Sequence, residues 1–373
     1  MSDPILVKHA RATYPVYVDP GIGAHLNERI RELLPGRRVA AITDIAVHDL
    51  LQQGKLGQLT WTGEMLTVPA GESSKSRENW AHLSDELLAR EFGRDSALCG
   101  MGGGVVGDLT GFVAATYMRG LPYILVPTTL LAMLDASVGG KTGINVPEGK
   151  NLIGAFHPPA GVIADPETLA TLPEREYRSG MAEAVKHGLI ADATYFTWIE
   201  THADALHRRD PIAIAALVRR SVEIKAAVVN EDELETGRRA ILNAGHTVAH
   251  ALEQTSGYEL THGEAVALGL IAECEIAERI GVASEGLHVR VAQLLGRLGL
   301  PTQLRDEVSR QSLLRRMAMD KKNRGRRIHM ALPTRLGEIH REGEQWTTAV
   351  TAEDIALGLM AVSPPQEPTQ THN

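Results

Sequence analysis

The spacing of hydrophobic and polar residues changes along the chain, and the change lies near Pro173. Before this point, short apolar runs such as Val39–Thr43 and Tyr123–Val126 alternate with segments that have helical spacing. Short continuous apolar runs are typical of strands that are buried on both faces of a parallel sheet. We therefore predict an α/β domain in which helices cover both faces of a mainly parallel sheet.

Further elements are expected in this first part. Ile5–Val7 and Val16–Val18 predict a short antiparallel pair of strands. Glu78–Ala89 has helical spacing and precedes a strand at Ala97–Met101. The strand that ends at Val126 is followed by Pro127-Thr128-Thr129, where a threonine can cap the next helix.

After Pro173, long segments have helical periodicity, and strand patterns are nearly absent until His329–Leu332. The sequence therefore predicts that a mostly α-helical domain follows the α/β domain. We expect the α/β domain at 1–173, the helical domain at 174–363 and a flexible, proline-rich tail at 364–373. The expected helices lie at Met181–Ile190, Ile212–Val229, Thr247–Glu253, Glu264–Ile280 and Val289–Leu298.

The composition is that of a globular protein with two domains of ordinary size. Of the 373 residues, 43% are hydrophobic and 23% are charged. The formal net charge of −8 excludes a global basic field for nucleic acid, so an anionic ligand needs a local cluster of lysine and arginine. No apolar run approaches the ~18 residues that span a bilayer, and no targeting signal is visible, so we expect a cytoplasmic protein. Cys99 and Cys274 have apolar neighbours and are expected to be buried free thiols.

A glycine cluster from Gly102 to Gly107 fits the pattern G-x-G-x-x-G between a strand and a helix. Glycines let the backbone approach a pyrophosphate, and the helix N-terminus supplies N–H groups to it. A tight turn without a ligand is the alternative. The cluster lies about a hundred residues into the chain, and no acidic residue ends the next strand, so a variant nucleotide fold is favoured over an ordinary Rossmann domain. If a dinucleotide binds, Asp44, at the end of an earlier strand, is the best candidate to bind its ribose.

A second glycine-rich stretch, from Asp135 to Asn145, resembles a phosphate loop only superficially. The pattern G-x-x-x-x-G-K-[ST] requires a glycine where Asp135 stands, so a P-loop is rejected. Lys141, Lys150 and Asn151 nevertheless lie in loop-like sequence, where cations and amides can close on an anion. A solvated surface loop is the alternative for each of them.

Charged residues also interrupt the apolar pattern of the predicted helices. Glu183 and Lys186 are spaced i, i+3, so they lie on one face of a helix and form either a buried ion pair or part of a site. Lys225, Arg238 and Arg239 add cations to the same domain, which favours an anionic ligand.

Three histidines lie close together in the second half of the chain. His246 and His250 are spaced i, i+4 on a predicted helix, and His262 begins another helix. With a carboxylate, such histidines can form a metal site with an open coordination position, although core histidines held by hydrogen bonds are the alternative. Spacing alone leaves open whether His246 or His250 is a ligand, and whether the carboxylate is Glu183 or Glu264. The pattern H-E-x-x-H is absent, which disfavours a zincin-type protease.

Taken together, these segments resemble the 3-dehydroquinate synthases from about Asp44 to Leu332. The matching stretches are GGGVVGDLTGFVAATYMRG, VPTTLLAMLDASVGGKTGIN, GKNLIGAFHPP, LPEREYRSGMAEAVKHGLIAD, EIKAAVV, LNAGHTVAHALE, HGEAVALG and MAMDKK. The resemblance implies a Rossmann-like N-terminal domain, a helical C-terminal domain, an active site in the cleft and a homodimer.

The resemblance also implies a role for individual residues. The metal ligands would be Glu183, His246 and His262, with Zn²⁺ as the expected ion and Co²⁺ as an alternative. The residues at positions that contact NAD are Asp44, Glu72, Lys75, Gly103, Gly104, Val105, Asp108, Thr128, Thr129, Asp135, Lys141 and Lys150. The residues at positions that contact substrate are Arg119, Lys141, Asn151, Lys186, Lys225, Arg239, Asn243, His250 and one of Lys321 or Lys322. Arg119 would reach into the site of the partner subunit.

The implied reaction converts 3-deoxy-D-arabino-heptulosonate 7-phosphate into 3-dehydroquinate and phosphate. It proceeds by transient oxidation with NAD, elimination of phosphate, reduction, ring opening and aldol closure. Met133, His187 and Ala244 depart from the residues usual in the family, which affects packing rather than the reaction class. The alternatives are a sister sugar-phosphate cyclase that makes an inosose or valiolone, a metal-dependent alcohol or glycerol dehydrogenase, and a non-catalytic relative that binds ligands.

Overall fold

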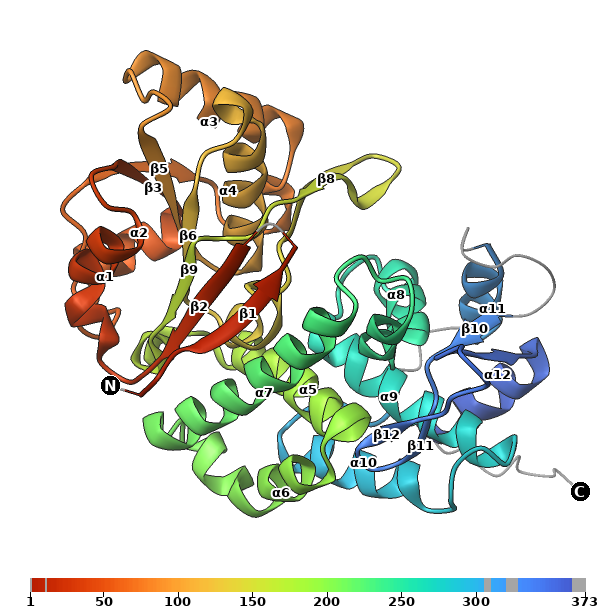
Figure 1. Cartoon of the computed structure of the whole chain (residues 1–373). Coiled ribbons are helices and arrows are strands. Elements are labelled where there is room, and N and C mark those ends of the chain that lie inside the picture. The colour runs from red at the N-terminus through yellow and green to blue at the C-terminus, as the bar shows by residue number, and fades with distance from the viewer. Residues whose placement is uncertain (1, 11, 305–309, 320–327, 364–373) are drawn as a thin grey trace, which may run out of the picture. The chain divides into compact units, whose positions relative to one another are not determined.

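The computed structural model describes residues 2–10, 12–304, 310–319 and 328–363 (Figure 1). The chain forms two compact units. Unit 1 consists of residues 1–180 and 204–234, and unit 2 consists of residues 181–203 and 235–373. The domain ranges expected from the sequence stay predictions, and the tail at 364–373 lies outside the described residues.

A seven-stranded sheet forms the centre of unit 1, in the order β1-β2-β9-β6-β5-β3-β4. β1 is antiparallel to β2, and the other neighbouring strands are parallel, so both the predicted antiparallel pair and the mainly parallel sheet are confirmed. The strands are β1 (Ile5–His9), β2 (Ala12–Val18), β3 (Arg38–Asp44), β4 (Glu64–Val68), β5 (Ser96–Gly102), β6 (Tyr123–Pro127) and β9 (Gly161–Ala164).

Helices pack on both faces of this sheet, as the apolar runs predicted (Figure 1). On one face, Cys99 and Met101 of β5 share a core with Leu26 of α1. On the other face, β5 approaches α4 so closely that a Cβ on Gly100 would lie 2.9 Å from Oγ1 of Thr110. The helices of this unit are α1 (Leu26–Leu33), α2 (Ile45–Gln52), α3 (Arg77–Ala89), α4 (Gly104–Thr116) and α7 (Pro211–Glu231), and α5 (Glu174–Ala191) begins in it.

The strand order determines where this sheet can bind a ligand. If β3, β4, β5, β6 and β9 are numbered one to five along the chain, their order is 2-1-3-4-5 rather than the usual dinucleotide order 3-2-1-4-5-6. The predicted departure from an ordinary Rossmann domain is therefore confirmed. The chain changes direction across the sheet between β3 and β5, and ligands of such sheets bind outside the carboxyl ends of the strands at that point. β3 ends at Asp44 and β5 ends at Gly102.

One local prediction is wrong. Lys141, Lys150 and Asn151 do not lie in a loop but on a two-stranded hairpin of β7 (Lys141–Val146) and β8 (Gly149–Phe156) (Figure 1). The glycines here indicate close strand pairing, because a Cβ on Gly154 would lie 2.2 Å from the carbonyl oxygen of Thr142. The predicted threonine cap is present, since Oγ1 of Thr129 accepts a hydrogen bond from Ala132 N at 3.2 Å.

Unit 2 is mainly helical, and its predicted helices are present. It contains the second part of α5, α8 (His246–Thr255), α9 (His262–Arg279), α10 (Leu287–Arg297), α11 (Arg310–Met319) and α12 (Ala352–Gly358). Two small sheets pair β10 (Ile328–Met330) with β13 (Thr348–Val350) and β11 (Pro333–Arg335) with β12 (Glu338–Ile339). α6 (Ala193–His207), which crosses from unit 2 into unit 1, was not predicted.

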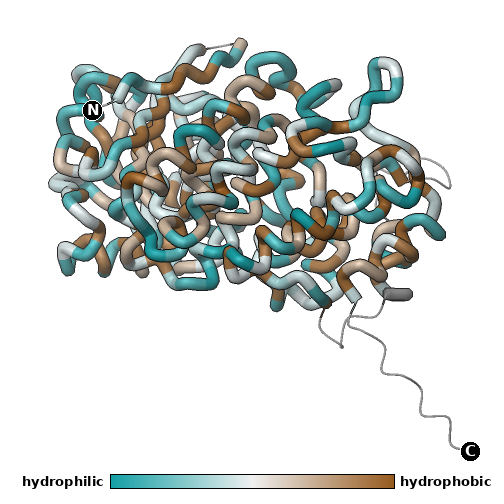
Figure 2. Tube along the Cα trace, turned by 90° about the horizontal axis from the view of Figure 1, so that it is seen from below, coloured by the Kyte–Doolittle hydropathy of each residue, from teal (hydrophilic) through white to brown (hydrophobic). Residues whose placement is uncertain are grey.

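Hydrophilic and hydrophobic segments alternate along the chain (Figure 2). Among the described helices, none is long and apolar enough to cross a membrane. Cys99 and Cys274 are buried free thiols, as expected from their apolar neighbours.

The two helices that carry the histidines, α8 and α9, pack at very short range. A Cβ on Gly269 of α9 would lie 2.0 Å from the carbonyl oxygen of Gly245, which immediately precedes α8. Because that neighbour is backbone, it cannot move without shifting α8 itself. Only glycine therefore fits at position 269.

We expect Gly269→Ala to lower the free energy of unfolding by about 1–3 kcal/mol, because the added methyl group pushes α8 away from α9. The measurement is urea unfolding of the full chain. Gly296→Ala is the matched control: Gly296 is exposed near the end of α10, and its Cβ would meet Thr302 Cγ2 at an ordinary 3.5 Å. This control should be neutral or stabilising by up to about 1 kcal/mol. Equal stability of both variants would contradict the close packing of α8 on α9.

Candidate functional site

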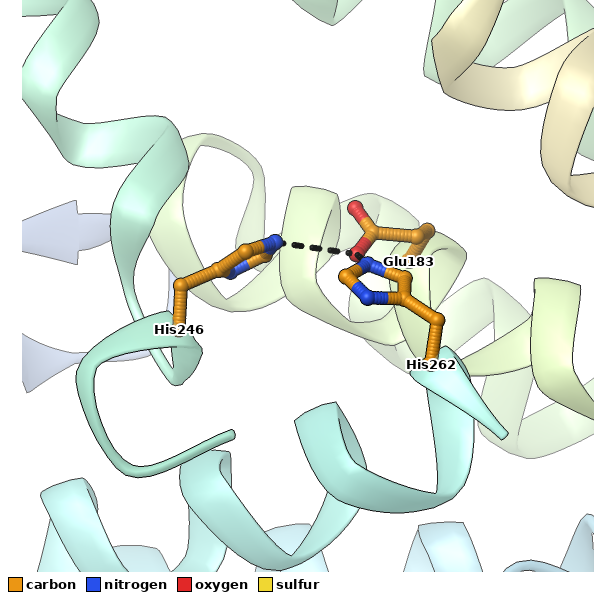
Figure 3. Close-up of side chains that lie close together, drawn as sticks. All are labelled: Glu183, His246 and His262. Carbon is orange, nitrogen blue, oxygen red and sulfur yellow. Dashed lines mark ion pairs between the residues drawn. The ribbon is translucent and has the colours of Figure 1, made fainter. Parts of the chain in front are cut away.

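Three helices of unit 2 bring Glu183, His246 and His262 together (Figure 3). Glu183 lies on α5, His246 begins α8 and His262 begins α9. Nε2 of His246 is 3.6 Å from Oε1 of Glu183, and Nε2 of His262 is 3.4 Å from the same oxygen. Two imidazole nitrogens therefore converge on one carboxylate oxygen.

This arrangement fits a divalent metal ion. A tetrahedral zinc ion, with bonds of about 2.0–2.2 Å, holds its ligand atoms about 3.3–3.6 Å apart. The two nitrogen–oxygen distances are close to this separation, and two histidines with one carboxylate are a known donor set of catalytic zinc sites. The side chain of Glu183 is 1% exposed and that of His262 is 31% exposed, so the cluster is buried on one side and accessible on the other.

The orientation of His246 is fixed by its own backbone. Its Nδ1 lies 3.1 Å from the carbonyl oxygen of Ala244, which can only accept a hydrogen bond. Nδ1 therefore carries the proton, and Nε2 directs its lone pair toward Glu183. This is the tautomer that a metal ligand requires at Nε2.

The charges around Glu183 hold the two histidines in different protonation states. Burial and the ammonium group of Lys186 lower the pKa of His246 to about 3, although the carboxylate of Glu183 opposes this. Burial also acts to lower the pKa of His262, but the carboxylates of Glu183 and Glu253 outweigh it and raise that pKa to about 9. Lys186, only 2% exposed, forms an ion pair with Glu183, as their i, i+3 spacing predicted. Without a metal ion, the cluster therefore holds its positive charge on Lys186 and His262.

The geometry bears on the alternatives that spacing left open. Of the three groups of side chains among the described residues whose ligand atoms lie within 4.8 Å of one another, the one with two histidines contains Glu183, His246 and His262. His250 is exposed, and its ring meets that of His246 edge-on with centroids 5.6 Å apart. Glu264 is engaged in a capping box, where it accepts a hydrogen bond from Thr261 N at 2.8 Å. These contacts favour Glu183 and His246 over Glu264 and His250 as ligands.

One carboxylate near this cluster was missed by the sequence analysis. Oε1 of Glu253 lies 3.7 Å from Nδ1 of His262. The sequence contains a pattern that could have identified it: His246, His250 and Glu253 follow the helical spacing i, i+4, i+7, so they lie on one face of α8.

In unit 1, the glycine cluster lies where a nucleotide loop is expected. Gly103 is the N-cap of α4, and Thr128 N donates a 2.9 Å hydrogen bond to the carbonyl oxygen of Gly102. A Cβ on Gly103 would lie 3.0 Å from the methyl group of Thr129, so the loop leaves little room for a side chain. Asp44 ends β3 and caps α2 by accepting from Val47 N at 2.9 Å.

Other predicted residues of unit 1 form ion pairs and hydrogen bonds beside this loop. Nζ of Lys75, only 4% exposed, is 2.5 Å from Oδ2 of Asp108. Burial raises the pKa of Asp108, and the ammonium group of Lys75 offsets this only in part. Lys225 on α7 binds both the carboxylate of Asp135, at 2.7 Å, and its carbonyl oxygen, at 2.6 Å. These contacts hold two lysines of the predicted site in fixed positions.

Polar groups of the β7–β8 hairpin form hydrogen bonds with one another and with Glu72, another residue of the predicted NAD site. Asn145 donates a hydrogen bond to Glu72 at 2.7 Å and accepts one from Asn151 N at 3.0 Å. Lys141 and Lys150, on β7 and β8, are exposed.

The remaining predicted substrate residues have varied surroundings. Arg119 is exposed, with a φ of 68°. Arg239 is buried, and Asn243 donates a 2.8 Å hydrogen bond to Glu235. Lys321 and Lys322 lie outside the described residues. The three departures from the family pattern, Met133, His187 and Ala244, are all buried.

Comparison with known proteins places the chain in a family. A family profile described as 3-dehydroquinate synthase N-terminal matches residues 65–179, and one described as 3-dehydroquinate synthase C-terminal matches residues 180–323. The chain belongs to the 3-dehydroquinate synthase family. The 3-dehydroquinate synthase of Symbiobacterium thermophilum is 46% identical over 354 residues, which are 94% of this chain and 98% of the relative.

Solved structures of related cyclases have the same fold. A 2-deoxy-scyllo-inosose synthase complexed with carbaglucose-6-phosphate, NAD⁺ and Co²⁺ is similar with a TM-score of 0.84 and 26% identity, over 95% of this chain and 99% of that one. The 2-epi-5-epi-valiolone synthase of Streptomyces hygroscopicus subsp. jinggangensis, with NAD⁺ and Zn²⁺ bound, has a TM-score of 0.82 and 30% identity, over 95% and 98%. The predicted fold class is confirmed.

We expect the affinity of this 3-dehydroquinate synthase family member for Zn²⁺ or Co²⁺ to rise about tenfold per pH unit between about pH 6.5 and 8.5. His262, with a pKa of about 9, is protonated over this range without metal, whereas a ligand must be neutral, so binding displaces one proton. Competition titrations with a chelator of known pH dependence measure this slope. His262→Asn, which removes both ligand and proton, should bind more weakly and with a smaller slope. An affinity independent of pH would contradict a charged His262.

Proposed function

We propose that this chain is a 3-dehydroquinate synthase that converts 3-deoxy-D-arabino-heptulosonate 7-phosphate into 3-dehydroquinate and phosphate. The observation that carries this proposal is the match to both domains of the family, together with 46% identity to a 3-dehydroquinate synthase over nearly the whole chain. The convergence of Glu183, His246 and His262 adds a metal site of the kind this chemistry requires.

The proposed cofactors are NAD and a divalent metal ion, Zn²⁺ or Co²⁺. The related inosose and valiolone synthases were solved with NAD⁺ and one of these ions, which supports the same pair here. Glu183, His246 and His262 would hold the metal. A metal ion at this place supplies Lewis acidity, which lowers the pKa of substrate hydroxyl groups bound to it.

The substrate carries a carboxylate and a phosphate, and the proposed substrate residues supply positive charge and hydrogen-bond donors for them. The proposed substrate residues include Lys225, which Asp135 fixes in position, and Lys186 and Arg239, both buried. Cations held in place by the fold favour one orientation of an anion without a further entropic cost. Asn243 and His250 are the uncharged polar residues of the proposed set.

NAD would bind at the change of strand direction in unit 1. The N-cap of α4 is a glycine, which carries no side chain to block a pyrophosphate, and the N-terminus of α4 would attract its charge. Asp44, at the end of β3, is proposed to accept a hydrogen bond from a ribose hydroxyl. Lys75 and Asp108, paired at 2.5 Å, would fix the helix that follows the glycine loop.

The sister cyclases are the second candidate class, and they are less favoured. Their solved representatives are 26–30% identical to this chain, whereas the 3-dehydroquinate synthase of Symbiobacterium thermophilum is 46% identical. A shared fold and shared cofactors do not by themselves determine the substrate.

We expect purified protein, given heptulosonate phosphate, NAD⁺ and Zn²⁺, to release phosphate and form 3-dehydroquinate without net accumulation of NADH. NAD is used and regenerated within one turnover, so its absorbance stays level while phosphate rises. A chelator should abolish the reaction, and added Zn²⁺ or Co²⁺ should restore it. Absence of phosphate release would refute the proposal. Turnover of glucose 6-phosphate or sedoheptulose 7-phosphate would instead identify a sister cyclase, and no turnover with retained NAD binding would identify a non-catalytic relative.

We further propose a homodimer in which Arg119 enters the site of the partner subunit, on the strength of the family resemblance. Arg119→Ala and His246→Ala should each be inactive alone. If the two variants are mixed and allowed to exchange subunits, about one quarter of the wild-type activity should return, because half of the dimers are mixed and each has one intact site. No recovery, with exchange verified, would contradict the shared site. The cytoplasmic location stays a prediction.

A further inference from the structure

Helices α8 and α9 each carry one proposed histidine ligand, and each also carries a carboxylate directed at the other helix. Glu273 of α9 lies beside the start of α8, where His246 is located. Glu253 of α8 lies beside the start of α9, where His262 is located. Each helix end that presents a histidine is therefore contacted by a carboxylate from its neighbour.

Glu273 takes the place of a capping side chain for α8. The N-cap of α8 is Gly245, in the left-handed conformation with a φ of 80°, so no side chain of α8 caps its own N–H groups. Instead, Oε2 of Glu273 accepts from Gly245 N at 2.6 Å, and Oε1 faces Val248 N at 3.4 Å. Side-chain oxygens that accept from the first N–H groups of a helix are the usual N-cap contact, and here they come from the neighbouring helix. Because His246 lies between these two N–H groups, Glu273 fixes the backbone that presents it.

Glu253 orients the other histidine. The ring of His262 has Nε2 at 3.4 Å from Glu183 and Nδ1 at 3.7 Å from Glu253. A carboxylate facing Nδ1 favours a proton on that nitrogen and leaves the lone pair of Nε2 directed at the metal position. Carboxylate–histidine–metal arrangements of this kind fix the tautomer and the ring orientation of the ligand. Glu253 is 6% exposed, so water competes little for this contact.

We propose that Glu253 and Glu273 are positioning residues of the metal centre, each holding the histidine of the opposite helix in the geometry that binds the ion. The inference rests on the metal site of the proposed function, but it does not depend on which substrate the enzyme turns over. It also accounts for the position of two acidic side chains inside an otherwise apolar helix packing.

A purely structural capping role is the competing explanation, and the chain contains a matched control for it. Glu278, also on α9, accepts hydrogen bonds from Gly286 N at 3.0 Å and His288 N at 2.7 Å. Gly286 is the left-handed N-cap of α10, with a φ of 89° and no side-chain cap of its own. Glu278 therefore does for α10 what Glu273 does for α8, but outside the cluster of Glu183, His246 and His262. Glu278 also belongs to a second group, with Glu275 and His288, whose ligand atoms could hold an ion. The control therefore refers to the Co²⁺ whose binding Glu183→Ala removes.

The experiment compares Glu253→Gln, Glu253→Ala, Glu273→Gln and the control Glu278→Gln in the full chain. Dissociation constants for Co²⁺ are measured by chelator competition, the ligand field is read from the visible spectrum of bound Co²⁺, and thermal unfolding is measured without metal. We expect Glu253→Gln and Glu273→Gln to weaken Co²⁺ binding by about 10- to 100-fold and to change the spectrum. Glu253→Ala should bind Co²⁺ more weakly than Glu253→Gln, because glutamine keeps an oxygen that can accept a hydrogen bond from Nδ1 of His262. Glu278→Gln should lower thermal stability but leave the affinity within about twofold of the wild type.

The proposal is overturned if the Glu253 and Glu273 variants bind Co²⁺ with wild-type affinity and spectrum, whatever their stability. It is also overturned if the wild type binds no Co²⁺, or if Glu183→Ala binds it unchanged. Should Glu273→Gln fail to fold, Glu253→Gln, which leaves the start of α8 intact, decides the question. Co²⁺ binding that depends on both carboxylates, in a protein that makes no 3-dehydroquinate, would refute the proposed reaction and leave this inference standing.

Discussion

The polar groups of unit 2 are arranged around one buried charge, the carboxylate of Glu183. A carboxylate removed from water costs several kcal/mol unless cations and hydrogen-bond donors surround it. Here the compensation comes from the ammonium group of Lys186 on the same helix and from the protonated imidazole of His262 on α9, while neutral His246 completes the cluster. The same electrostatic requirement that keeps the fold intact therefore gathers the donor set of a metal site. A bound cation would satisfy this carboxylate at least as well as the proton that His262 otherwise retains.

The approach of α8 to α9 makes this convergence possible. Two helices can present their first residues to one point only if their backbones come close, and the contact of Gly269 with the carbonyl oxygen of Gly245 allows that. Polar backbone groups at such a buried helix start need partners, since no side chain of α8 caps them. The carboxylate of Glu273 meets that need, so packing, capping and ligand presentation depend on one another.

In unit 1, the corresponding constraint is topological. The order of the parallel strands places the carboxyl ends of β3 and β5 side by side, with Asp44 at one and the glycine loop at the other. The sequence indicated both groups but could not show that they are neighbours, because they are separated by β4 and α3 along the chain. The hairpin of β7 and β8 was predicted as a loop for a related reason. Its glycines suggest irregular structure until the opposite strand, which they allow to approach, is known.

Local spacing in the sequence was sufficient wherever interactions are local. The alternation of apolar runs and helical segments predicted the strands and most helices, and the i, i+3 spacing predicted the pair of Glu183 and Lys186. It failed for α6, whose aromatic and β-branched residues have modest helix propensity but whose buried stripe, Phe196, Ile199, Ala203 and Leu206, has helical spacing.

Spacing in the sequence could not decide which histidines face Glu183, and only the family resemblance indicated them. The carboxylate that contacts Nδ1 of His262 and the group that caps α8 were decided by the tertiary structure alone. Periodicity determines the face of a helix on which a residue lies. The rotation and distance between packed helices, set by contacts far apart in sequence, determine which faces meet.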